Sequence, residues 1–121
     1  MTAGEWDRAH LWRFRARCFR PIDGDTFVAI ADVGFGAAAL PHIRIAGFHA
    51  PERGEIGAML ATADLIDALT AQDDTWPWPL RIESKMRETV ISPVKSFERY
   101  VATVWLVMPD GSMTDVRDIL T

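Results

Sequence analysis

The sequence predicts a single domain spanning residues 1–121, mainly β with inserted helices (α+β), in which five strands form a Greek-key barrel. The length of 121 residues is that of one ordinary domain. Hydrophobic residues make up 49% of the chain and charged residues 25%, a balance typical of folded globular chains and not of disordered ones. Apolar residues alternate with polar ones along most of the chain, and helical spacing is confined to two stretches, so the sequence favours a β architecture.

Three strands are predicted in the first half of the chain. From Leu11 to Arg20, apolar residues alternate with arginines, which indicates one buried and one cationic face. Asp23-Gly24-Asp25 is a turn signal, and the run from Thr26 to Val33 is rich in residues that favour strands. His42 to Phe48 predicts the third strand, in which His42 and Arg44 share one face.

The second half predicts a helix, two strands and a short final helix. Glu55 to Ala71 has apolar residues at helical spacing, and the prolines of Trp76-Pro77-Trp78-Pro79 favour an extended connector after it. Leu80 to Val90 and Tyr100 to Met108 predict strands four and five, and Thr114 to Leu120 predicts the last helix. Five strands with a helix between the third and fourth fit a small barrel of the OB type, a fold named for oligonucleotide binding.

Composition also limits the compartment and the partners. A lone Cys18 excludes an internal disulfide and a thiolate zinc cluster, and it favours a reducing cytoplasm. We expect no secretory signal, because no cationic segment leads into an apolar run, and no membrane span, which needs about 20 apolar residues. The net charge of −4 argues against bulk coating of nucleic acid, although five arginines in residues 1–20 form a local basic region.

Four segments, in this order, together resemble the staphylococcal (thermo)nuclease family. The match runs from about residue 12 to the C-terminus. The segments are Ile22-Asp23-Gly24-Asp25-Thr26-Phe27, Ile43-Arg44-Ile45-Ala46-Gly47-Phe48-His49-Ala50-Pro51-Glu52, the predicted helix, and Phe97-Glu98-Arg99-Tyr100-Val101-Ala102. The resemblance implies a five-stranded barrel with a calcium-dependent phosphodiesterase site on its outer face.

The resemblance also implies roles for individual residues. Asp25 matches a carboxylate that binds the metal, and Ala50 matches a position that contributes its backbone carbonyl. Glu52 matches the glutamate that orients or deprotonates the attacking water, while Arg44 and Arg99 match two arginines that bind phosphate. These residue types suit phosphodiester hydrolysis, which needs ligands for a cation, a base, and positive charge near the phosphorus. Each also has a plainer interpretation, such as a turn aspartate, a carboxylate near a helix start, or a solvated strand arginine.

His49 departs from the family, because it stands where a second metal-binding aspartate is usual. An imidazole nitrogen in place of a carboxylate oxygen should weaken the binding of Ca²⁺ and favour the binding of Mn²⁺ or another transition metal. His49 is therefore expected at the metal with Asp25, or it is a hydrogen-bonded loop histidine in a barrel whose metal site has decayed.

Three functions remain open at this point. The first is a metal-dependent nuclease acting on DNA, RNA or both. The second is a catalytically impaired barrel that binds nucleic acid or a protein partner without cutting, and a purely structural accessory is a third. Further candidates for nucleic-acid contact are His42, Arg15, Arg17 and Lys95. The family's further C-terminal helix is missing, so we expect the barrel to be covered by the Trp-rich connector or by a second subunit in a homo-oligomer.

Overall fold

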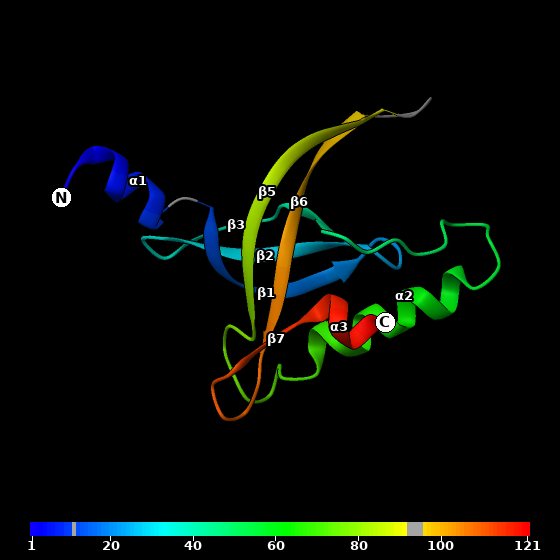
Figure 1. Cartoon of the computed structure of the whole chain (residues 1–121). Coiled ribbons are helices and arrows are strands. Elements are labelled where there is room, and N and C mark those ends of the chain that lie inside the picture. Colours follow the sequence, from blue (N-terminus) through cyan, green and yellow to red (C-terminus); the bar gives the residue numbers. More distant parts are fainter. Residues whose placement is uncertain (11, 92–95) are drawn as a thin grey trace.

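A computed structural model describes residues 1–10, 12–91 and 96–121. Within these residues the chain forms three helices and seven strands (Figure 1). In chain order the elements are α1 (Ala3–His10), β1 (Arg13–Pro21), β2 (Thr26–Gly34), β3 (Ala37–Ala39), β4 (His42–Ile45), α2 (Ala58–Thr70), β5 (Leu80–Ile91), β6 (Ser96–Val107), β7 (Met113–Asp115) and α3 (Val116–Leu120).

Five of the strands close into a barrel. β1 pairs antiparallel with both β2 and β5, β5 pairs antiparallel with β6, and β4 joins β2 antiparallel and β6 parallel. The ring β1–β2–β4–β6–β5 therefore returns to β1, and closure removes the exposed edges that an open sheet would leave. β3 extends β2, and β7 extends β6. The mainly β architecture and the closed five-strand barrel are confirmed, and they are consistent with an OB-like fold.

The barrel core follows the alternation in the sequence. In β4, Ile43 and Ile45 are each 1% exposed, while His42 and Arg44 face the other side. Helix α2 adds apolar side chains to the same core and packs against β1 and α3, at the end of the barrel where Figure 1 shows the two helices together. The buried cluster includes Ala16, Phe27, Ala29, Leu65, Leu69, Leu80, Ile82, Ala102, Val104, Leu106 and Val116.

Several predicted boundaries are wrong, and glycine turns explain two of them. The third strand ends at Ile45 and not at Phe48, because the chain turns at Gly47, where φ is +73°. The helix predicted from Glu55 begins at Ala58, because turns occupy the preceding residues and Gly57 has φ +84°. The fifth strand starts at Ser96 and pairs with β5 from Ser96 to Leu106, so the hairpin is longer than predicted.

The sequence predicts Trp12 and Trp105 inside the barrel, but both lie outside it. Trp12 is 57% exposed in a turn before β1, with φ +65°, and Trp105 is half-buried on the outer face of β6. Cys18 is half-buried against the core, and burial, with a contribution from Asp73, raises the pKa of its thiol to about 11. The thiol is therefore protonated at neutral pH, as a packing residue would be. In the described part of the chain, no helix combines the length and hydrophobicity needed to cross a membrane.

Candidate active site

The turn between β1 and β2 holds two carboxylates close together. The Asp25 amide donates a hydrogen bond to Asp23 Oδ1 at 3.2 Å. Gly24, between them, leaves no room for a side chain, because a Cβ there would lie 2.6 Å from the Cβ of Ala50 and 2.7 Å from that of Ala61. The glycine thus lets the turn press against the loop after β4 and against α2. A cleft of about 330 Å³ opens beside Asp23 along α2.

The two carboxylates differ in their preference for the proton. Burial would raise the pKa of Asp25, but hydrogen bonds with Asp23, Thr26 and the Ala50 amide, together with the Arg44 charge, lower it below its ordinary value. For Asp23, burial raises the pKa, and the side-chain hydrogen bond with Asp25 raises it further. Asp25 is therefore the ionised member of the pair, and Asp23 is the one that retains a proton more readily.

Arg44 connects this turn to the loop after β4 and to β5. Its Nη2 donates to Nδ1 of His49 at 2.6 Å, its Nε lies 3.9 Å from Asp25 Oδ2, and its Nη1 lies 3.6 Å from Glu88 Oε1. Because a guanidinium only donates, Nδ1 of His49 must accept, which requires an imidazole without a proton at that nitrogen. Arg44 is largely shielded from solvent, with its side chain 22% exposed.

Arg99 joins the same cluster through Glu88. The two residues are directly opposite in the β5–β6 register, and Arg99 Nε donates to Glu88 Oε1 at 2.5 Å. β4 runs parallel to β6 and pairs Arg44 with Val101, so both arginines lie on neighbouring strands and share one carboxylate. We name the set Asp25, Arg44, His49, Glu88 and Arg99 the arginine cluster.

The remaining predicted site residues lie apart from this cluster. Glu52 is exposed in the turn after β4, its backbone carbonyl accepts from the Glu55 amide at 2.9 Å, and its carboxylate makes no hydrogen bond or ion pair within the described residues. His42 is half-buried on β4, two residues before Arg44. Arg15 and Arg17 lie on β1, where they pair with Asp32 and Asp73 respectively. Lys95 lies outside the described residues.

A metal ion would find oxygen donors here, although not a complete set of side-chain ligands. Among the described residues, no group of three or more His, Cys, Asp or Glu side chains is arranged to hold a metal. The available donors are the carboxylates of Asp23 and Asp25 and the backbone of Ala50. Two neighbouring carboxylates, of which Asp25 disfavours the charge of Asp23, suit a hard divalent cation, which would relieve that repulsion. His49 would have to leave Arg44 to join them.

No protein-family model matches the chain, and no curated protein matches it significantly. The class of protein is therefore described by its fold and candidate site alone. It is a closed five-strand barrel, consistent with an OB-like fold, and it carries two arginines and a carboxylate pair on one face. Sequence reasoning missed Asp23 and Glu88. Asp23 stands in the recognised turn, and its spacing to Asp25 was a usable signal, whereas Glu88 depended on a hairpin register that the sequence did not reveal.

Proposed function

We propose that the protein is a metal-dependent phosphodiesterase that hydrolyses DNA, RNA or both. One observation carries the proposal, namely that two arginines from different strands converge on one place beside the ionised Asp25. A guanidinium can bind two phosphate oxygens at once, and two of them can stabilise the charge that develops during hydrolysis. Phosphate oxygens would replace His49 and Glu88 as partners of the two arginines.

The roles of the residues follow from this arrangement. A divalent cation held by Asp25, His49 and the Ala50 carbonyl would polarise the phosphate, and it would be Ca²⁺ by resemblance or Mn²⁺ or another transition metal because of His49. Arg44 and Arg99 position the phosphate and neutralise its charge. Glu52, which is exposed and unpaired within the described residues, is free to orient the attacking water and accept its proton.

Glu52→Gln tests this proposal, with Glu55→Gln as the matched control in the same exposed turn. We expect the wild type to digest plasmid and single-stranded DNA or RNA with at least one of Ca²⁺, Mg²⁺, Mn²⁺ and Ni²⁺. The Glu52 variant should lose on the order of 10²–10⁴ in rate, because an amide cannot accept the proton. It should bind oligonucleotides in EDTA as the wild type does. Unchanged turnover in the Glu52 variant would show that Glu52 is not the base. If the wild type cuts with none of the four cations, the nuclease proposal is refuted.

Two observations favour the second candidate function, a barrel that binds nucleic acid without cutting. His49 accepts a hydrogen bond from Arg44, and no group of three acidic, His or Cys ligands is assembled among the described residues. A protein of this kind would bind single-stranded probes and leave them intact with all four cations.

A further inference from the structure

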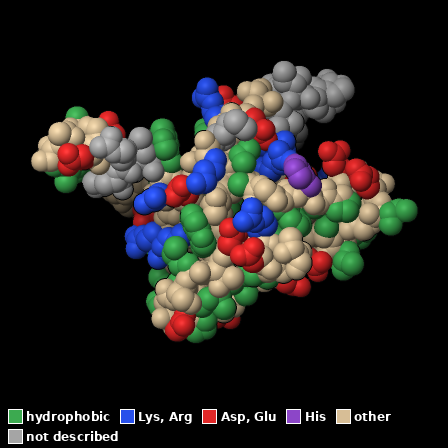
Figure 2. All heavy atoms as spheres, viewed as in Figure 1, with side chains coloured by type: hydrophobic (Ala, Val, Ile, Leu, Met, Phe, Trp, Pro, Cys, Tyr) green, Lys and Arg blue, Asp and Glu red, His purple; other side chains and the backbone are tan. Residues whose placement is uncertain are grey.

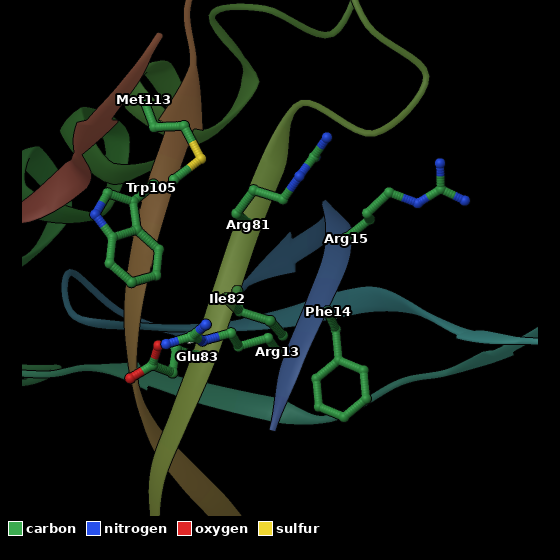
Figure 3. Close-up of a pocket in the computed structure, with 8 residues that line it drawn as sticks. All are labelled: Arg13, Phe14, Arg15, Arg81, Ile82, Glu83, Trp105 and Met113. Atoms are coloured by element: carbon green, nitrogen blue, oxygen red, sulfur yellow. Dashed lines mark hydrogen bonds and ion pairs between the residues drawn. The ribbon is translucent and has the colours of Figure 1, made fainter. Parts of the chain in front are cut away.

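A second group of cations surrounds a groove on the outer face of the barrel, where β1, β5, β6 and β7 meet (Figure 3). The groove has a volume of about 440 Å³. Figure 2 shows basic side chains gathered where β1 begins, beside β5. The groove residues that matter here are Arg13, Arg15, Arg81, Glu83, Trp105 and Met113.

Two of the three groove arginines have carboxylate partners. Arg13 Nε donates to Glu83 Oε2 at 2.8 Å, and Glu83 also pairs with Lys85. Arg15 Nη2 donates to Asp32 Oδ2 at 2.5 Å. Both arginines are well exposed, with side chains 67% and 55% accessible, so these ion pairs are weak and their guanidiniums can turn to another anion.

Arg81 differs from the other two, because no carboxylate pairs with it in the part of the chain that the structure describes. Its Nη1 donates to the carbonyls of Trp78 and Leu80, at 2.8 and 3.0 Å. It is half-buried, and burial, followed by the charge of Arg15, lowers its pKa. An arginine stays charged even so, and the groove therefore keeps positive charge that no neighbouring acid balances.

An aromatic side chain lies beside this charge. Trp105 is directly opposite Arg81 in the β5–β6 register, and Figure 3 shows its ring on the side of the groove next to Met113. Cationic side chains beside an aromatic face are the combination that binds single-stranded nucleic acid, because phosphates meet the cations and an unpaired base stacks on the ring. A paired base in a duplex cannot stack in this way.

The groove and the arginine cluster share one face of the β5–β6 hairpin. Ala102, Val104 and Leu106 are buried, so Arg99 and Trp105 project from the opposite side of β6. On β5, Arg81 lies opposite Trp105, and Glu88 lies opposite Arg99 on the other side of a bulge between Ser84 and Met86. Trp105 lies six positions after Arg99 along β6, which is a distance of about 20 Å.

We propose that this groove binds a single-stranded segment of the nucleic acid whose neighbouring phosphate lies at the arginine cluster. Arg13, Arg15 and Arg81 would contact phosphates, and Trp105 would stack a base. At about 3.4 Å per stacked nucleotide, six nucleotides cover the distance between the two sites. The inference rests on the proposed function in one respect, namely that the ligand is a nucleic acid.

The test uses a fluorescein-labelled dT8 oligonucleotide and anisotropy titrations at several salt concentrations, in EDTA to stop cation-dependent cleavage. Arg13→Ala and Trp105→Ala alter the groove. Arg20→Ala is the control, since it removes the same charge from an exposed position on β1 outside the groove and the cluster. Arg13→Ala should lower the slope of log affinity against log salt by about 0.7, the value for one lost phosphate contact. Trp105→Ala should weaken binding about 5- to 150-fold, the range for one stacked base.

Three results would overturn the groove: no binding of dT8 by the wild type, equal losses in Arg13→Ala and Arg20→Ala, or a duplex of the same length that binds as tightly as dT8. Thermal denaturation checks that each variant folds. If Trp105→Ala does not fold, Arg13→Ala still tests the groove, because Arg13 is exposed and its side chain is not needed for packing. The proposed function fails separately. If the wild type binds dT8 through the groove but cuts nothing, the groove proposal stands and the nuclease proposal fails. If the wild type cuts and the groove variants bind dT8 normally, the nuclease proposal stands and the groove proposal fails.

Discussion

Replacing Asp23 by asparagine should stabilise the protein at neutral pH when no divalent cation is present. The wild-type turn holds two partly buried carboxylates, and Asp25 disfavours the charge of Asp23. Asparagine keeps an oxygen to accept from the Asp25 amide, which now donates to Asp23 at 3.2 Å. Its amide nitrogen can donate to the Asp25 carboxylate, and so replaces the proton that the two acids share.

The size of the effect follows from one hydrogen bond gained by a charged group in a half-exposed place. We expect a gain of about 1 kcal/mol in the free energy of unfolding, which is below the roughly 1.5–3 kcal/mol of hydrogen bonds to charged groups because solvent competes here. In a domain of this size that corresponds to a rise of about 4 °C in Tm. Thermal denaturation followed by circular dichroism, in EDTA, measures it. Asp67→Asn, at an exposed position of α2, is the control and should leave Tm unchanged.

The pH dependence has a definite sign. The raised pKa of Asp23 means that the folded protein holds this proton longer than the unfolded chain does. Its contribution to stability is therefore lost as the pH rises from the ordinary value of 3.8 through the folded value. The lowered pKa of Asp25 acts oppositely, and its contribution is lost as the pH falls below 3.8. The advantage of Asp23→Asn should therefore grow from pH 4 to pH 8.

A divalent cation should reverse the ranking. A ligand that binds only the folded state adds about 2.7 kcal/mol at 100 times its Kd, and the wild type offers it one carboxylate more than the variant. With Ca²⁺ or Mn²⁺ present, the wild type should melt higher. An Asp23→Asn protein that melts below the wild type at pH 8 in EDTA would refute the account of the carboxylate pair. If no cation changes the ranking of the two proteins, Asp23 is not a ligand of the metal.

Two substitutions in the arginine cluster give the remaining predictions. Arg44→Lys keeps the charge but loses the planar fork, so the rate of cleavage should fall much more than substrate binding, and a parallel fall in both would make Arg44 a simple anchor. His49→Asp should move the cation preference from Mn²⁺ or Ni²⁺ toward Ca²⁺. The same cation ranking in both proteins would show that His49 is not a ligand.

The strands could be predicted from sequence because each has one face in the core. In β4, the alternation of His42, Ile43, Arg44 and Ile45 is the alternation of exposure in the structure. Such a pattern predicts which way a side chain faces, but it does not predict the residue at which the strand ends. The predicted third strand continued to Phe48, because the positive φ of Gly47 is a property of the turn and has no signal in hydrophobicity.

The tryptophans show a second limit. An apolar residue at the start of an alternating run predicts burial, and Trp12 satisfies the pattern. The chain enters β1 only at Arg13, and the turn before it leaves Trp12 exposed. Trp105 keeps the alternation but lies on the outer face, where Arg81 and Met113 border it. Size and hydrophobicity therefore do not determine burial at either position. The start of the strand determines the exposure of Trp12, and the face of the strand determines that of Trp105.

The contacts of the candidate site depend on register, which sequence patterns leave undetermined. Arg44 and Arg99 are far apart in the chain, and they share Glu88 only because β4 and β6 pair in parallel while β5 and β6 pair with Glu88 opposite Arg99. A shift of one residue in either pairing would move one partner to the other face of its strand. The family resemblance pointed to the two arginines, but only the register supplies the acid between them.

The charges of the two sites predict different dependences on a cation. In the arginine cluster, Arg44 and Arg99 are balanced by Glu88 and the ionised Asp25, so a phosphate there gains little net attraction until a cation adds positive charge. In the groove, Arg81 has no acidic partner among the described residues, and a phosphate gains attraction from the protein alone. Binding in EDTA therefore reports the groove, and the additional binding that a cation produces reports the cluster. The two sites can thus be measured separately in one protein.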